Sequence, residues 1–345
     1  MEKPTIGMIG LGRMGSNISL QAMEKGYSVL GYDLHQNEEL QKHGLQQEAS
    51  LNELISKLSE PRILFVFVPS GAIVDHTLDQ LSTILSEGDI IIDGGNSYWG
   101  DSIKRGNKLK EKGIYLIDCG TSGGVEGARN GACFMAGGEP KAMKHVGPIL
   151  TDLAVEHGFV HTGKSGSGHF VKLVHNGIEF GMMQAIGEGM ELLANYKDEL
   201  NFPEILKNWN HGSVIRSWLI ELMANVYENK NGFESVSSFV EDTGEVNWLV
   251  EDAMRMEVPV PVISLSVMQL FASRNSAHIA DKAIAMMRHG FGGHPFGPDK
   301  AIEYERRFSK AEHIDSNHLL KEIPNKAPCM TQWYLYNPIQ QKNSN

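Results

Sequence analysis

Residues 168–184, GHFVKLVHNGIEFGMMQ, bring several side chains that can bind a ligand or move a proton into one short stretch. If the stretch is helical, Lys172, His175, Asn176 and Glu179 stand at positions i, i+3, i+4 and i+7 and share one face. An apolar row with the spacing of a core-facing surface runs beside them: Val171, Val174, Ile178, Met182 and Ala185. Burial of that row would draw the charged side chains inward, where they need charged partners or a ligand. A solvated helix face is the alternative.

The first half of the chain alternates strand and helix patterns. Five nearly continuous apolar runs predict parallel strands that are covered on both faces: 5–10, 28–33, 62–68, 89–95 and 114–120. Helical patterns at 13–25 and 72–86 fit right-handed βαβ crossovers, and runs at 134–139 and 156–163 extend the sheet. The pattern therefore predicts an α/β Rossmann-type doubly wound sheet.

Strand signals stop after about residue 166, and an all-α helical domain is expected to follow. One long helix is predicted over 168–200, and further helical patterns cover 203–228, 246–256 and 260–289. We expect three parts: a dinucleotide-binding Rossmann domain (1–165), a helical substrate and dimerisation domain (166–295), and a C-terminal extension (296–345) whose polar end is expected to fray.

The segment GLGRMG follows the first predicted strand and opens the first helix, which is the context required of a dinucleotide-binding turn. Gly10 would make the tight turn, Gly12 would admit the pyrophosphate, and Gly15 would allow close packing of helix and strand. Leu11, Arg13 and Met14 complete the segment, and the helix N-terminus would face the anion. A glycine-rich turn without a ligand is the competing interpretation.

Asp33 ends the second predicted strand, 18 residues after Gly15. That spacing suits a carboxylate on the adenosine ribose hydroxyls, and a carboxylate there repels a 2′-phosphate. The following residues, 34–39, include no arginine, so NAD is preferred over NADP as the cofactor. Val68 and Pro69, after a later strand, are expected beside the cofactor.

Two glycine-rich turns, 93–97 and 119–131, also follow strands and so belong to the ligand-binding edge of an open α/β sheet. Asn96 offers a donor and an acceptor. The backbone amides of Ser122, Gly123 and Gly124 can approach a carboxylate closely. Taken alone, these turns could be structural. Because they occur together with a polar helix face and a dinucleotide turn, we expect them to bind a ligand, and Asn96 also to contact the cofactor.

Composition limits the partners. The net charge of −11 argues against nucleic acid or an anionic membrane, and makes an anionic substrate dependent on a local cationic cluster. The sequence contains no apolar run of 18 residues and no signal-peptide pattern. Its three cysteines, Cys119, Cys133 and Cys329, have neither zinc nor disulfide spacing, which favours reduced thiols in a cytoplasmic protein. No metal site is expected.

Together, GLGRMG, DGGNS, TSGGVEGARNG and GHFVKLVHNGIEFGMMQ resemble 6-phosphogluconate dehydrogenase, within the β-hydroxyacid dehydrogenase superfamily. The resemblance runs to about residue 195 and resumes over 243–294, where TGEVNW, VPVP and RHGFGGH resemble family segments. A single short helical domain is similar to the short-chain branch, which tends to use NAD.

The resemblance implies oxidative decarboxylation of a phosphorylated β-hydroxy acid. Lys172 would act as the base in its neutral form, which requires a pKa lowered by desolvation, and Glu179 would act as the acid. The residues that would hold the substrate are Asn96, Ser122, Gly124, His175 and Asn176. His175 could instead be a structural helix residue.

The phosphate pocket departs from the family pattern. Phe180 stands where the family usually has tyrosine, and Glu241 and Asp242 stand where it has a lysine. Arg274, Arg288 and His294 remain as candidate phosphate ligands, with a structural salt bridge as the alternative for Arg274. Arg288 and His294 match an element that reaches the neighbouring subunit's phosphate in longer relatives, which implies at least a dimer.

Two other functions compete. One is a β-hydroxyacid dehydrogenase acting on another small 3-hydroxy acid, which Phe180 and the missing lysine favour. The other is a catalytically silent dinucleotide sensor, which Lys172 and Glu179 argue against.

Overall fold

The computed structural model describes residues 3–308, which divide into two compact units. Of the described residues, the first unit contains 3–180 together with 242–267, and the second contains 181–241 together with 268–308. Helix α8 (Ser167–Ala194) contributes to both. Within the described residues, no helix combines the length and apolar character that spanning a bilayer requires.

The first unit is built on one eight-stranded sheet in the order β3-β2-β1-β4-β5-β6-β7-β8. The strands are β1 (Thr5–Ile9), β2 (Ser28–Tyr32), β3 (Gln46–Gln47), β4 (Ile63–Val66), β5 (Ile90–Asp93), β6 (Tyr115–Ser122), β7 (Ala132–Gly137) and β8 (Ala154–Gly163). Neighbours are parallel except β6 and β7. The seven predicted strands are confirmed, and the short β3 is an addition. The strand order reverses beside β1, which is where ligands bind in doubly wound sheets.

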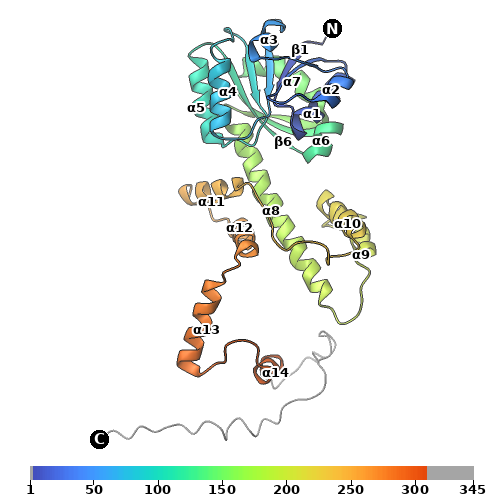
Figure 1. Cartoon of the computed structure of the whole chain (residues 1–345), viewed down its shortest axis with the longest axis vertical. Coiled ribbons are helices and arrows are strands. Elements are labelled where there is room, and N and C mark those ends of the chain that lie inside the picture. Colours follow the sequence, from blue (N-terminus) through green and yellow to red (C-terminus); the bar gives the residue numbers. More distant parts are fainter. Residues whose placement is uncertain (1–2, 309–345) are drawn as a thin grey trace, which may run out of the picture. The chain divides into compact units, whose positions relative to one another are not determined.

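Helices cover both faces of this sheet (Figure 1). The helices between the strands are α1 (Arg13–Glu24), α2 (Glu38–Lys42), α3 (Leu51–Ser56), α4 (Ala72–Leu81), α5 (Trp99–Lys110), α6 (Gly124–Asn130) and α7 (Pro140–Leu153). In β4, Phe65 packs in a core with α1, α6 and α7, whereas Leu64 packs in a core with α3, α4 and α5. Because successive strand residues point to opposite faces, a continuously apolar strand supplies both cores.

All-α structure follows the sheet, as predicted, but two of the predicted helices are wrong. The expected helix at 203–228 is divided into α9 (Phe202–Asn210) and α10 (Trp218–Lys230), because Ser217 caps a new start by accepting from the Ile220 amide. The expected helix at 260–289 is divided into α12 (Pro261–Arg274) and α13 (Ile279–Gly292), with His278 left-handed at φ 49°. The remaining helices are α11 (Glu245–Arg255) and α14 (Lys300–Phe308). The end of the predicted extension, 309–345, lies outside the described residues.

The first turn of α8 packs directly on the sheet. Asp118 of β6 accepts hydrogen bonds from the amides of Gly166 (2.6 Å) and His169 (2.9 Å), so a buried carboxylate satisfies the start of the helix. A Cβ atom on Gly168 would lie 2.2 Å from the Asp118 carbonyl oxygen. Only glycine allows this approach, which sets where the next turns of α8 begin.

We predict that Gly168→Ala destabilises the protein by at least about 2 kcal/mol, because the added methyl group has no space against the sheet. Gly187→Ala, on the same helix, is the matched control, since its added Cβ would meet nothing within 4 Å. Urea denaturation of both variants measures the difference. Equal stability of the two variants would contradict the proposed close contact.

Candidate active site

The turn between β1 and α1 has the geometry expected of a dinucleotide loop. Gly10 has a φ of 90°, and a Cβ there would lie 2.3 Å from the Phe67 carbonyl oxygen. A Cβ on Gly15 would lie 2.0 Å from the Gly10 carbonyl oxygen, whereas a Cβ on Gly12 would meet nothing within 4 Å. The first and third glycines thus allow internal packing, and the second leaves space open beside the backbone.

The start of α1 is available to an anion. Gly12 is the N-cap, no side chain of the described chain caps this end, and the first turn, Arg13 to Gly15, has no acidic residue. Asp33 accepts from the Leu11 amide (2.6 Å) and the His35 amide (2.9 Å). The carboxylate thus lies between the glycine turn and the end of β2, as ribose binding would require.

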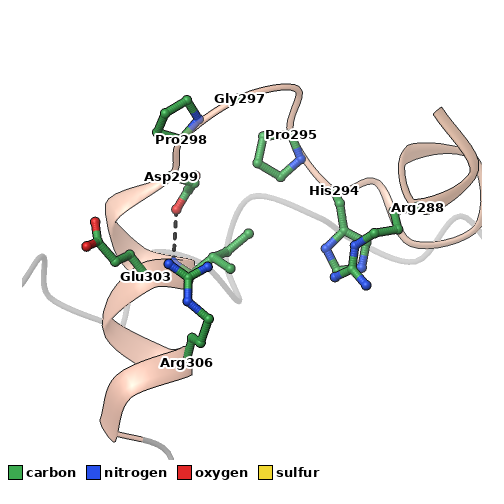
Figure 2. A pocket seen from close by; sticks show the side chains of 9 residues that line it. Arg288, His294, Pro295, Gly297, Pro298, Asp299, Glu303 and Arg306 are labelled. Atoms are coloured by element: carbon green, nitrogen blue, oxygen red, sulfur yellow. Dashed lines mark hydrogen bonds between the residues drawn. The ribbon is translucent and has the colours of Figure 1, made fainter. Parts of the chain in front are cut away.

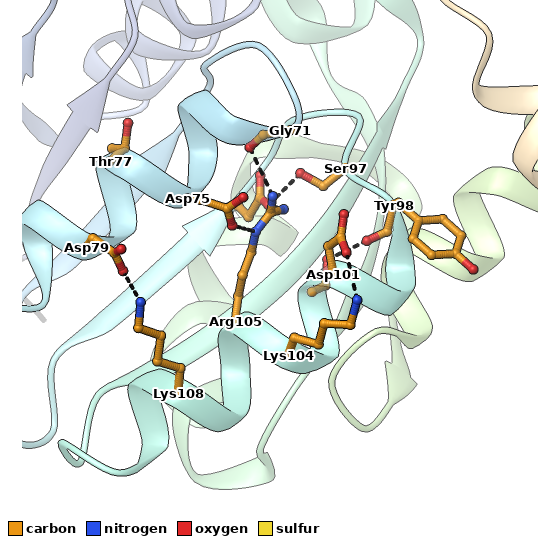
Figure 3. Close-up of polar contacts among 12 residues, drawn as sticks. Gly71, Asp75, Thr77, Asp79, Ser97, Tyr98, Asp101, Lys104, Arg105 and Lys108 are labelled. Carbon is orange, nitrogen blue, oxygen red and sulfur yellow. Dashed lines mark hydrogen bonds and ion pairs between the residues drawn. The ribbon is translucent and has the colours of Figure 1, made fainter.

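Arg105 holds two further loops at this edge of the sheet (Figure 3). Its buried guanidinium donates to the Gly71 carbonyl (3.1 Å) and to Asp75 (2.7 Å), and it lies 3.8 Å from Asp93. Asp93 in turn accepts from the Ser97 hydroxyl at 2.7 Å. The loop that carries Val68 and Pro69 is therefore tied to the loop that carries Asn96.

The polar row of α8 faces this edge. Lys172 is only 8% exposed, and its Nζ lies 2.5 Å from Asn176 Oδ1 and 3.4 Å from His175 Nδ1. The other ring nitrogen of His175 lies 3.1 Å from the Ser122 hydroxyl. A Cβ on Gly120 of β6 would come within 2.3 Å of Lys172 Cβ, so the lysine packs against bare backbone.

Burial changes the pKa of both basic side chains in this row, Lys172 and His175. It lowers the pKa of the Lys172 amine, while the carboxylates of Glu179 and Glu245 oppose the shift. Burial also lowers the pKa of His175, and the neighbouring Lys172 adds to the effect. Both changes favour neutral side chains that can accept a proton.

Two carboxylates complete the cluster. Glu179 Oε2 lies 3.7 Å from His175 Nδ1, and its side chain is 39% exposed. Glu245, at the start of α11, accepts from Asn96 at 3.0 Å and from Asn176 at 3.5 Å. Glu245 was not among the predicted site residues, although its position in the TGEVNW segment is a usable signal.

The loop after β6 lies beside this cluster. Gly123 is left-handed (φ 111°) and is the N-cap of α6, and Gly124 begins that helix with a φ of 59°. No side chain within the described range caps this helix start. The backbone amides after Ser122 are therefore open to an acceptor.

The prediction that the apolar row of α8 is buried is wrong for most of its members. Val171 and Ile178 are exposed, whereas the polar side chains of Lys172 and Asn176 are buried. The polar row is buried because it finds partners on the sheet, on Asn96 and on Glu245. Phe180 packs instead in an apolar cluster with α11 and α12.

The other predicted ligands belong to the second unit. Arg288 and His294 line one pocket of about 220 Å³, together with Arg306 of α14 (Figure 2). Arg274 donates to the Val240 carbonyl at 3.0 Å and lies 3.7 Å from Glu241. Arg274 thus takes part in an ion pair, whereas Arg288 and His294 line the same pocket, and their role as phosphate ligands stays a prediction.

The cysteines have ordinary environments. Cys119 is buried, Cys133 is exposed, and both are free. Cys329 lies outside the described residues. Across residues 3–308, no group of three or more His, Cys, Asp or Glu side chains is arranged to hold a metal ion.

Family models and similar sequences all point to one protein family. Residues 5–163 match the NAD binding domain of 6-phosphogluconate dehydrogenase, and residues 168–307 match the 6-phosphogluconate dehydrogenase C-terminal domain. The chain is 46% identical over 291 residues to "Putative 6-phosphogluconate dehydrogenase YqeC" of Bacillus subtilis (strain 168), covering 84% of this chain and 98% of that one. It is 38% identical to the "6-phosphogluconate dehydrogenase, NAD(+)-dependent, decarboxylating" of Haloferax volcanii, covering 84% and 97%.

A solved structure of a 6-phosphogluconate dehydrogenase has a similar fold. Plasmodium falciparum 6-phosphogluconate dehydrogenase, determined in apo form and with NADP+ or 6-phosphogluconate, superposes with a TM-score of 0.74 at 28% identity and covers 88% of this chain and 68% of that one. The matched domains, the glycine turn and the lysine-bearing helix all agree: this chain belongs to the 6-phosphogluconate dehydrogenase family.

Proposed function

We propose that this protein catalyses the oxidative decarboxylation of 6-phospho-D-gluconate to D-ribulose 5-phosphate and CO₂, with NAD preferred over NADP. The observation that carries the proposal is the buried amine of Lys172, which lies beside Asn176 and His175 at the ligand-binding edge of the sheet. The reaction named for the Haloferax volcanii relative supports it.

The substrate carboxylate fits the amides that follow Ser122, because Gly123 and Gly124 leave the backbone bare there. Asn96 and Asn176 offer side-chain amides to the sugar hydroxyls. His175, whose ring lies between Ser122 and Lys172, is a further hydroxyl partner. These contacts would direct C3 of the substrate toward Lys172.

Bound NAD would supply the acceptor for the hydride, with its two electrons, that leaves C3. Neutral Lys172 takes the proton of the C3 hydroxyl, and the ammonium so formed then donates a hydrogen bond to the new ketone. The C1–C2 bond breaks, CO₂ leaves, and the released electron pair forms an enediol as Lys172 returns the proton to the C3 oxygen. Burial aids this role because it lowers the pKa of the amine.

Glu179 is the proposed acid for the last step. It gives a proton to the carbon that carried the carboxylate, while Lys172 removes the proton from the C3 oxygen and the ketone forms. A proton transfer from Lys172 to Glu179 then resets both groups. The 3.7 Å separation of Glu179 and His175 is consistent with a role at the same cluster.

The preference for NAD rests on Asp33 and its neighbours. The Asp33 carboxylate is held near the glycine turn by the Leu11 amide, and the next side chain, Leu34, is 85% exposed and uncharged. A carboxylate suits ribose hydroxyls and repels a 2′-phosphate, which no nearby arginine of residues 34–39 offsets. The NAD(+)-dependent relative supports the same preference.

The phosphate is proposed to bind at the pocket of Arg288 and His294, supplied by a second copy of the chain. Arginine pairs with phosphate oxygens through two parallel hydrogen bonds. Exposed apolar side chains on α8, among them Val171 and Ile178, support such a partner, and so does α13, in which no residue is buried within the described chain. The active site would then be shared within a homodimer or larger oligomer.

A β-hydroxyacid dehydrogenase that uses an unphosphorylated acid is the second candidate. Phe180 packs among apolar side chains where a hydroxyl could otherwise reach a phosphate, and Glu241 adds negative charge where a lysine is expected. Both features disfavour a phosphate at those two positions.

The first test combines the substrates, the cofactors and Lys172. We expect 6-phosphogluconate turnover with CO₂ release, a higher kcat/KM with NAD than with NADP, and no turnover of 3-hydroxyisobutyrate.

Lys172→Met should lower kcat by about 10²–10⁴-fold and leave the Kd for NADH unchanged. For the wild type, kcat/KM should fall as the pH drops below the pKa of Lys172, because the amine becomes protonated. Preference for the unphosphorylated acid would select the second candidate.

Gly12→Val tests the dinucleotide turn. The new side chain finds open space in the protein and should leave thermal stability unchanged, but it would occupy the place of the cofactor. We expect the Kd for NADH, measured by fluorescence titration, to rise more than about tenfold. Unchanged NADH affinity would remove the turn from the cofactor site.

Arg288→Ala tests the phosphate site, with Lys282→Ala on the same helix as control. The KM for 6-phosphogluconate should rise by roughly tenfold or more through loss of the bidentate pair, while the kcat/KM for unphosphorylated gluconate stays unchanged. A structural arginine would instead lower the melting temperature and leave the KM alone.

A further inference from the structure

We propose that Glu245 is a positioning residue of the proposed active site: it holds the side-chain amides of Asn96 and Asn176, and through Asn176 it sets the place of the Lys172 amine. This inference rests on the proposed function and adds to it a residue from α11, 69 positions from Asn176 along the chain.

The hydrogen bonds around Glu245 define one orientation of each asparagine. Oε1 accepts from Asn96 Nδ2 at 3.0 Å and, more weakly, from Asn176 Nδ2 at 3.5 Å. The Asn176 carbonyl oxygen then faces Lys172, whose Nζ lies 2.5 Å away. The flipped amide would direct its carbonyl at a carboxylate and its NH₂ at the lysine amine. Glu245 therefore selects the orientation in which Asn176 binds Lys172 as an acceptor.

Glu245 is itself held in place. The hydroxyl of Thr243 donates to its second oxygen, Oε2, and Gly244 caps α11 with a left-handed φ of 81°. About two turns further along α11, the buried Asp252 accepts hydrogen bonds from the Tyr98 hydroxyl (2.9 Å) and from Trp99 Nε1 (2.7 Å). The helix is thus fixed to the segment that directly follows Asn96.

The negative charge of Glu245 also affects the pKa of Lys172. The groups that act on Lys172 are Glu179 and His175 on α8, Glu245 on α11 and Cys133 on β7. Burial lowers the pKa of Lys172, and the carboxylate of Glu245 raises it. Removal of that negative charge should therefore lower the pKa further, and the amine should become reactive at a lower pH.

Two substitutions distinguish the positioning role of Glu245 from the effect of its negative charge. Glu245→Gln keeps an oxygen for the asparagines and removes the charge, whereas Glu245→Ala removes both. Glu251→Gln, an exposed position on the same helix, is the matched control. In substrate-free enzyme, the pH at which an acylating reagent labels Lys172 is measured by peptide mass spectrometry, and steady-state kinetics with 6-phosphogluconate is measured in parallel.

We expect the labelling midpoint of Lys172 to fall by about 0.5–1 pH unit in both Glu245 variants and to stay in place in the control. Glu245→Gln should keep kcat within a few-fold, while Glu245→Ala should lower it by roughly ten- to a hundredfold, because Asn176 loses its orientation. The Kd for NADH should not change. A Glu245→Ala enzyme with the midpoint and kcat of the control would overturn the proposal.

The labelling experiment needs no turnover, so it distinguishes the two possible failures. If wild-type enzyme does not oxidise 6-phosphogluconate, the proposed function fails, and the midpoint still decides whether Glu245 acts on Lys172. If Glu245→Ala is unstable, Glu245→Gln gives the same decision, since an unshifted midpoint there contradicts the contact.

Discussion

Helix α8 meets the carboxyl edge of the sheet at two glycines, and the rest of the site depends on that contact. Gly168 and Gly120 have no side chains, so the helix backbone reaches β6 and Lys172 packs against it. Asp118 accepts hydrogen bonds from two backbone amides at the start of α8, and these bonds fix the first turn of the helix on β6. Because a helix is rigid, this one anchor also sets where His175 and Asn176 lie, one turn beyond Lys172.

The same contact buries the amine of Lys172, the proposed base. A lysine that is buried beside polar groups loses hydration, and this lowers the pKa of its amine. The effect is moderated by two carboxylates, Glu179 from the same helix and Glu245 from α11. The proposed base has to be neutral in one step and an ammonium in the next, and burial and the two carboxylates favour these two forms in turn. Backbone packing and acid–base behaviour are therefore one property of this structure.

Apolar side chains on two helices, α8 and α13, are exposed to solvent, where they do not stabilise a single copy of the chain. Val171 and Ile178 are exposed on the helix that carries the polar row, and α13 buries none of its side chains within the described residues. Exposed apolar side chains of this kind support the proposed contact with a second copy of the chain. In the proposed oligomer, a second copy would cover these side chains and bring Arg288 and His294 to a neighbour's substrate. Their pocket and the lysine cluster would then serve the one proposed reaction.

The sequence by itself determined the features that depend on neighbours along the chain. The glycine turn at residues 10–15, the seven longer strands and the polar row of α8 follow from local spacing and strand periodicity. Tertiary structure decided which face of α8 is buried, because partners from β6 and α11 outweigh the apolar row beside it. It also decided the role of Glu245, since a contact across 69 residues leaves no periodic signal. Local patterns report backbone preference, whereas the burial of a charged group depends on which distant groups can satisfy it.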